Sequence, residues 1–198
     1  MHVFSQFIKP PLTNESIRTA VHLWCEDPSQ ATAEYGRIED WDTSEVTDMC
    51  KLFLNRFRFS DDISGWDVSS VADMSYMFGS ATSFNQDLSG WNISSVTNMS
   101  HMFDSASSFN QDVNEWDVSR VTDMNSMFRG ATLFNQGLSQ WDVSRVTNMS
   151  DMFHDASSFN QDLSGWGVSS VTDMNSMFRN ATAFNHDLSG WNVSKVTN

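Results

Sequence analysis

The stretch at residues 66–89 reads WDVSSVADMSYMFGSATSFNQDLS, and its pattern recurs every 25 residues from Trp41 onward. Seven of the eight tryptophans keep this register without an insertion or a deletion: Trp41, Trp66, Trp91, Trp116, Trp141, Trp166 and Trp191. A fixed period of about 20–50 residues is typical of repeat proteins, in which each unit buries its apolar side chains against its neighbours. We number the positions of each unit from its tryptophan, which is position 0.

Two hydrophobic periods alternate within each unit. Apolar residues at positions 5, 8, 11, 12 and 15 are spaced mostly by three or four, which predicts one face of a short helix. Positions 0 and 2 are apolar around a residue that is usually polar, which predicts a short strand. The segment SFNQDLSG at residues 83–90 is rich in turn-forming residues. We therefore expect an α/β repeat of about six 25-residue coils, each with a short strand, a short helix and a loop, whose strands pair in parallel.

The unit at residues 66–89 resembles the repeat of BspA-like leucine-rich-repeat surface proteins of the mycoplasma-lipoprotein type. The run LSGWNISSVTNM at residues 88–99 also resembles the leucine-rich frame L-x-x-L-x-L, although Val at position 5 replaces the usual Asn of that frame. The resemblance covers residues 41–198 and implies a right-handed leucine-rich-repeat-like solenoid. It also implies a cell-surface or secreted protein that is used for adhesion or protein contact.

The segment before the repeats has a different pattern. Its apolar residues follow the spacing of an amphipathic helix: Ile17, Ala20, Val21 and Trp24. We expect a flexible arm at residues 1–12, a helical N-terminal cap at residues 13–40 and the repeat solenoid at residues 41–198. The arm lacks the basic start and the long apolar core of a signal peptide. The last unit stops inside an expected helix, which indicates truncation of a longer array.

The charge balance excludes several classes of partner. The sequence has 25 acidic and 11 basic residues and a formal net charge of −14, whereas nucleic acids and anionic membranes attract basic surfaces. No apolar run is long enough to span a membrane, so we expect no membrane insertion. Nearly every polar residue recurs once per unit, so no unique catalytic constellation stands out. We therefore expect no enzymatic activity, no cofactor and no metal.

Acidic and amide residues form two columns beside the tryptophans. At position 1 they give our candidate interaction face: Asp67, Asn92, Asp117, Asp142 and Asn192. At position 21 they are Asp62, Asp87, Asp112, Asp162 and Asp187. Stacked carboxylates could bind calcium, but we favour turn formation and helix capping. We expect a non-enzymatic surface interaction or adhesion module that presents this repetitive acidic polar face to a protein or glycan partner.

Several alternatives stay open from the sequence alone. The repeats could be a purely structural spacer, or the tryptophans could form an exposed strip that stacks on sugar rings, although a buried ladder is favoured. The residues that vary most between units lie at positions 4, 10 and 13. Cys25 and Cys50 could form a disulfide, but two free thiols are favoured.

Overall fold

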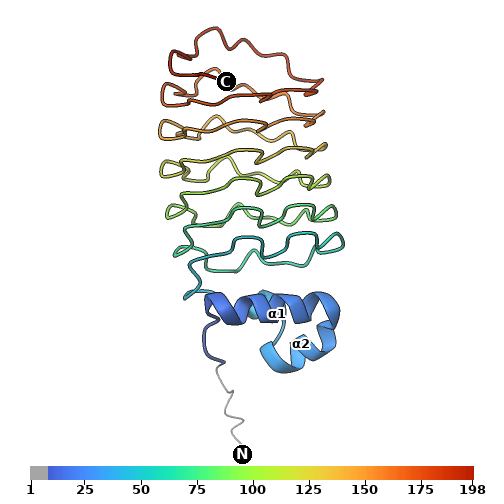
Figure 1. The fold of residues 1–198 in the computed structure, drawn as a ribbon. Helices are drawn as coiled ribbons and strands as arrows, with labels where there is room; N and C mark the ends of the chain where they lie inside the picture. The colour runs from blue at the N-terminus through green and yellow to red at the C-terminus, as the bar shows by residue number, and fades with distance from the viewer. Residues whose placement is uncertain (1–8) are drawn as a thin grey trace, which may run out of the picture.

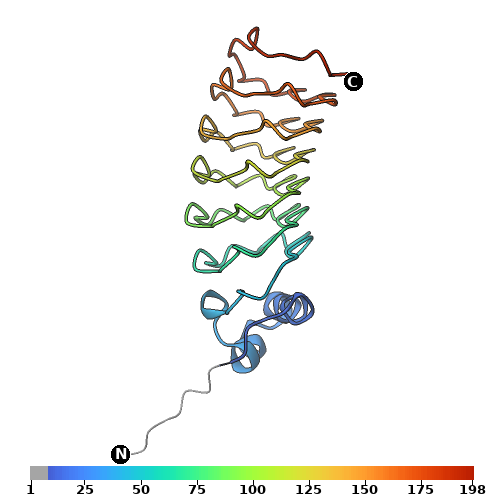
Figure 2. The ribbon, with the colours of Figure 1, turned by 90° about the vertical axis from the view of Figure 1, so that its left-hand side faces the viewer.

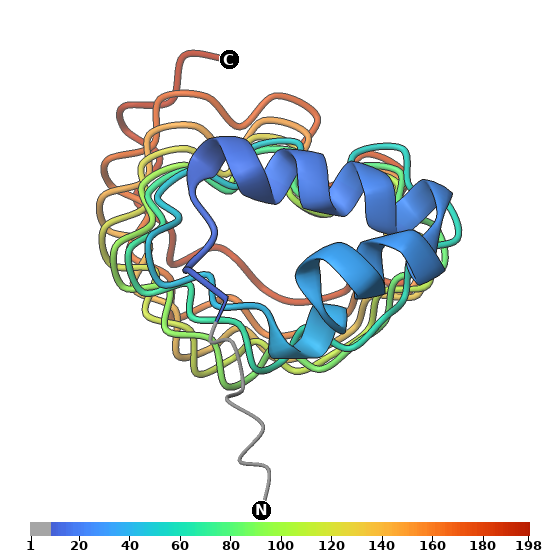
Figure 3. The same ribbon diagram turned by 90° about the horizontal axis from the view of Figure 1, so that it is seen from below.

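The computed structural model describes residues 9–198, which form a stack of coils closed at its N-terminal end by two helices (Figures 1 and 2). The helices are α1 (Asn14–Glu26) and α2 (Pro28–Tyr35), and a short 3-10 helix, η1 (Ile38–Asp40), leads into the first coil. Figure 3 shows α1 and α2 lying across the end of the stack. The flexible arm was expected at residues 1–12, of which residues 1–8 lie outside the described part; Leu12 is buried and donates its N–H to the Asp42 carbonyl.

Side chains fix the boundaries of both helices. Thr13 caps α1, because its hydroxyl accepts the N–H of Ser16 while the Ser16 hydroxyl accepts the N–H of Thr13. Asp27 separates the helices and caps α2 through the N–H of Gln30, with Pro28 at the first helical position. The buried face of α1 consists of Ile17, Ala20 and Val21. α1 therefore covers the first coil with apolar side chains.

The expected α/β repeat and leucine-rich-repeat solenoid are wrong. Within residues 9–198 the only α-helices are α1 and α2, and no strand or sheet forms. Successive turns occupy the expected helix positions: Met102 donates its N–H to the Met99 carbonyl, and Ala106 to the Phe103 carbonyl. A turn also occupies the expected strand, where Trp91 donates its N–H to Leu88. Turns closed between residues three apart put every third side chain inside, so their spacing imitates that of a helix.

Left-handed residues prevent these turns from continuing as a helix. Each complete coil has a positive φ at positions 10 and 14, for example 57° at His101 and 60° at Ser105. A right-handed helix cannot include such residues. At position 14, four of the six residues are of types that adopt this geometry readily, namely Asn55, Gly130, Asp155 and Asn180, and the other two are Ser80 and Ser105. Position 10 gives no such signal, since it includes Lys51 and Tyr76.

Backbone hydrogen bonds join each coil to the next. In the third coil (residues 91–115), Met99 donates its N–H to the carbonyl of Asp123 at 3.0 Å, and Phe103 donates to Met127 at 2.9 Å. Isolated parallel bridges connect the residues at position 7: Asp48, Asp73, Asn98, Asp123, Asn148 and Asp173. The bridges stay isolated because the left-handed residue at position 10 interrupts the extended backbone three residues later.

Aromatic side chains run along the interior of the stack. The tryptophans of the first six coils are only 2–5% exposed, so the prediction of a buried tryptophan ladder is confirmed for them. The Trp116 indole donates its Nε1–H to the Leu88 carbonyl at 3.0 Å, and the same bond recurs at every repeat tryptophan after Trp41. Phenylalanines stack beside them; the rings of Phe103 and Phe128 are 5.6 Å apart and nearly parallel. The aromatic core is therefore continuous along the stack.

A polar ladder that we did not predict runs along position 19. The side-chain Oδ1 of each asparagine accepts the backbone N–H of the asparagine one coil later, at 2.8–2.9 Å. Its members are Asn85, Asn110, Asn135, Asn160 and Asn185. Glutamines at position 20 add a second bond between coils, as where Gln111 donates to the Asn85 carbonyl. The repeated SFNQ motif therefore fixes the register of one coil on the next.

Candidate interaction surfaces

Exposed carboxylates line both sides of the tryptophan turn along the stack. We call them the acidic edge: Asp42, Asp67, Asp117 and Asp142 at position 1, and Asp62, Asp87, Asp112, Asp162 and Asp187 at position 21. Each starts a local turn by accepting the backbone N–H two residues later, as Asp87 does from Ser89 at 2.8 Å. The turns aim the carboxylates outward at regular intervals.

The residues of the predicted interaction face lie in one exposed row. The structure brings Asp67, Asn92, Asp117, Asp142 and Asn192 into register, one per coil, with a gap at Gly167. Turn formation is thus their local role, whereas the expected helix capping is wrong because no helix follows them. Within residues 9–198, no group of three or more His, Cys, Asp or Glu side chains is arranged to hold a metal ion.

Local hydrogen bonds lower the pKa of several carboxyls of the acidic edge. The hydroxyl and the backbone N–H of Ser69 lower the pKa of Asp67, and Ser119 and Ser144 act in the same way on their aspartates. The backbone N–H of Ser89 lowers the pKa of Asp87, although the neighbouring charge of Asp62 opposes this shift. The local hydrogen bonds therefore prevail over repulsion between neighbouring carboxylates.

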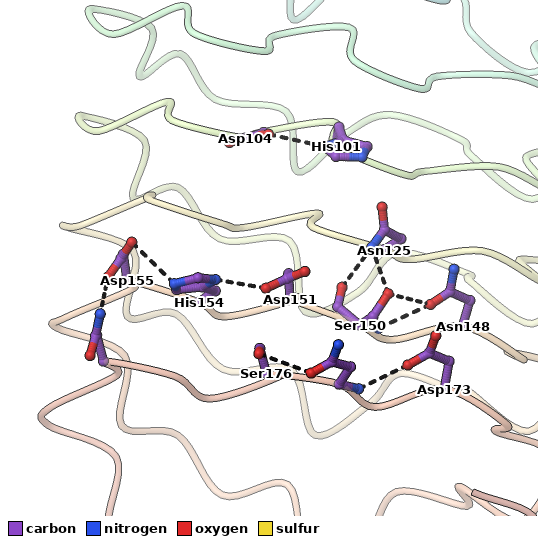
Figure 4. A network of polar contacts seen from close by, with 12 residues as sticks. His101, Asp104, Asn125, Asn148, Ser150, Asp151, His154, Asp155, Asp173 and Ser176 are labelled. Carbon is purple, nitrogen blue, oxygen red and sulfur yellow. Dashed lines mark hydrogen bonds and ion pairs between the residues drawn. The ribbon is translucent and has the colours of Figure 1, made fainter. Parts of the chain in front are cut away.

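A second surface collects the residues that differ between coils. We call positions 10 and 13 the variable face. In the third coil the His101 ring nitrogen lies 2.9 Å from the Asp104 carboxylate, and His101 stacks on Tyr76 of the coil before it at 4.1 Å. In the fifth coil His154 lies between Asp151 and Asp155, at 2.6 and 3.4 Å. Figure 4 shows the contacts of His101 with Asp104 and of His154 with Asp151 and Asp155.

The junction between the cap and the first coil contains a pocket that the sequence did not reveal. Its volume is about 400 Å³, and its walls come from the end of α1, the start of α2 and residues 55–61 of the first coil. Cys25 lines it as a free thiol whose pKa is raised by burial, and Cys50 is also free, so the disulfide alternative is wrong. The sequence signal that could have indicated this pocket was the departure of the first coil from the repeat.

Comparison with known families places this chain among repeat proteins. A family profile described as "Mycoplasma protein of unknown function, DUF285" matches residues 28–120 and again residues 110–198, and the chain belongs to that family. The match supports a mycoplasma-type repeat and does not by itself confirm the BspA-like type. Comparisons with curated proteins and with solved structures found no match. In the described part of the chain, no helix is long and apolar enough to cross a membrane.

Proposed function

We propose that this chain is a non-enzymatic protein-interaction module whose acidic edge binds a basic protein partner. The observation that carries the proposal is that the acidic edge has more negative charge than turn formation requires. Asn92 and Asn192 make the same turn as the aspartates of their row, with a distance of 3.2 Å between the backbone nitrogen and the side-chain oxygen. Yet all five turn-forming residues of position 21 are aspartates. Neighbouring carboxylates repel, so amides would give these turns without that repulsion.

The acidic edge also has no cationic partner of its own. None of the ion pairs within residues 9–198 includes a carboxylate of the edge. Parallel bridged coils lie about 4.8 Å apart, so neighbouring carboxylates of one row share a fixed spacing. A row of unpaired charges at fixed spacing favours a partner that presents several basic side chains together.

Other readings of the repeat have less support. Burial of the tryptophans to 2–5% removes the exposed strip on which sugar rings would stack, which favours a protein partner over a glycan. A purely structural spacer would need no unpaired acidic rows, and it is the competing outcome of the test below. A location at the cell surface or outside the cell is a separate part of the proposal, and its support is the resemblance of the repeat to surface proteins.

Two charge-matched variants test the acidic edge. The edge variant carries Asp87→Asn, Asp112→Asn and Asp162→Asn, which keep the turn-forming oxygens. The control variant carries Glu15→Gln, Glu34→Gln and Asp155→Asn at exposed positions away from the edge. Titration calorimetry with a ten-residue lysine peptide at physiological salt compares their dissociation constants.

We expect the edge variant to weaken binding about tenfold more than the control, because each lost surface pair contributes about 0.2–1 kcal/mol. Equal weakening of both variants would mean that net charge alone attracts the peptide. No binding by the unaltered protein would favour the spacer. Either result overturns the proposal.

A further inference from the structure

The first coil, residues 41–65, departs from the repeat at three consecutive positions. Positions 15–17 hold Arg56, Phe57 and Arg58. The five coils after it have alanine at position 15 and serine or threonine at position 16, with Ser, Ala or Leu at position 17. In a chain whose units are otherwise so uniform, this departure needs a local cause.

Docking of the cap explains part of the departure. Arg56 donates to the Glu26 carboxylate at 3.0 Å and lies 2.9 Å from the ring nitrogen of His22, so it ties the first coil to α1. Asp61, another residue particular to this coil, accepts the indole N–H of Trp24 at 3.1 Å. These contacts fix the cap on the first coil and account for the presence of Arg56 and Asp61.

Docking does not explain Phe57 and Arg58. The Phe57 side chain is 56% exposed, although the same position elsewhere carries a small polar residue. Arg58 is exposed and has no carboxylate within ion-pair distance in the described part of the chain. Phe57 and Arg58 together therefore leave an aromatic ring and a guanidinium free to contact a ligand at the same place.

Both residues line the pocket of about 400 Å³ at the cap junction. Three aromatic side chains contribute to its walls: Trp24, Phe57 and Phe59. The volume is in the range of small-molecule sites, about 300–1,000 Å³. Aromatic walls favour a planar ring, and a free guanidinium favours a carboxylate, which it can bind through two parallel hydrogen bonds.

We propose that this pocket binds an aromatic carboxylate, with its ring against Trp24 and Phe57 and its carboxylate on Arg58. Arg56 and Asp61 are positioning residues, because their contacts with Glu26 and Trp24 hold the walls in place. A free aromatic acid and the C-terminal phenylalanine of a peptide share this chemistry. The site is independent of the acidic edge, so the edge variant described above should keep it.

The test uses the full chain and three probes: 3-phenylpropionate, its uncharged analogue 3-phenylpropan-1-ol, and an acetylated glycyl-glycyl-phenylalanine with a free carboxylate. Calorimetry gives the affinities. The NMR resonance of the Trp24 indole N–H reports binding at the pocket, and that of the buried Trp116 indole serves as an internal reference. Tighter binding of the peptide than of phenylpropionate would identify a peptide C-terminus as the source, and weaker binding a free acid; both support the proposal.

Two variants and two controls make the proposal specific. We expect Arg58→Gln to weaken phenylpropionate about tenfold and to bring it to the level of the alcohol, because the lost hydrogen bonds involve charged groups. Phe57→Ala should weaken both probes. Leu133→Ala removes a side chain that is also 56% exposed but lies outside the pocket, and Arg120→Gln removes an exposed arginine elsewhere; neither should change binding. The proposal is overturned if the Trp24 resonance does not respond, if acid and alcohol bind equally, or if the controls weaken binding as much as the pocket variants.

Discussion

The third coil and the sixth coil (residues 166–190) have almost the same apolar pattern but very different burial. In the third coil Met99 and Phe103 are fully buried. The equivalent Met174 and Phe178 of the sixth coil are only partly buried. The difference arises because the third coil has a complete coil on each side. A unit of this protein therefore has no core of its own, and the interfaces between units provide the stability.

The N-terminal end supports the same conclusion. There α1 takes the place of a neighbouring coil, since the buried Ile17 and Val21 belong to the same hydrophobic cluster as the first-coil residues Trp41, Val46 and Met49. Leu52 and Phe53 of the first coil are buried although no coil precedes them. A helix can thus replace a coil as long as it supplies apolar side chains at the end of the stack.

Removing a tryptophan should show the largest difference between the centre and the last turn of the stack. Trp116 is 2% exposed, and Trp116→Ala should lower the free energy of unfolding by about 3–5 kcal/mol. Trp191→Ala removes the same atoms from a half-buried site, so we expect a clearly smaller loss. Urea unfolding at constant pH measures both values. Equal losses would contradict the conclusion that burial depends on neighbouring coils.

The energetic cost of a side chain at a left-handed position should depend less on where the coil lies in the stack than the cost of removing a tryptophan does. Gly130 has a φ of 64°, and a Cβ there would lie 3.3 Å from the Ser105 hydroxyl oxygen, so Gly130→Ala should destabilise the protein by about 1–2 kcal/mol. Gly90→Ala is the control, since its φ is not positive and a Cβ there would meet nothing within 4 Å.

The residue equivalent to Gly130 in the sixth coil is Asn180, with a φ of 58°. Asn180→Ala should also be destabilising, although it additionally loses a 2.8 Å hydrogen bond to Asp155. Thermal unfolding of the three variants separates backbone strain from burial. An effect at Gly90 as large as at Gly130 would refute the role of the left-handed conformation.

Acidification should give the smallest and most evenly distributed effect. Local hydrogen bonds lower the pKa of Asp87, Asp117 and Asp162 from the ordinary value of 3.8 in the folded state. A lowered folded-state pKa stabilises the protein above 3.8, and this stabilisation is lost as the pH falls below that value. Melting temperatures measured from pH 6 downward should therefore decline below about pH 4. Asp87→Asn and Asp162→Asn should each make the decline slightly shallower, and a decline unchanged by both would show that other groups cause it.

The sequence predicts the period, the buried tryptophan ladder and the amphipathic pattern now seen in α1. It does not predict the turns, because side chains three apart face the same way in a helix and in a series of turns. Only the left-handed residues separate the two structures; position 14 gives a partial sign of that conformation, whereas Lys51 and Tyr76 at position 10 give none. The acidic rows could be placed from the repeat alone. The pocket could not, since it depends on how α1 docks on a coil of unusual sequence.

The hydrogen bonds between coils have a mechanical consequence. They run along the stack, as from Met99 to Asp123, so tension applied at the C-terminal end loads the outermost interface first. The coils then peel away one at a time, and each releases 25 residues of chain, or roughly 80–90 Å when fully extended. Because the units are nearly identical, successive steps need similar forces. Under load we therefore expect the stack to lengthen in equal increments and to absorb work at each one.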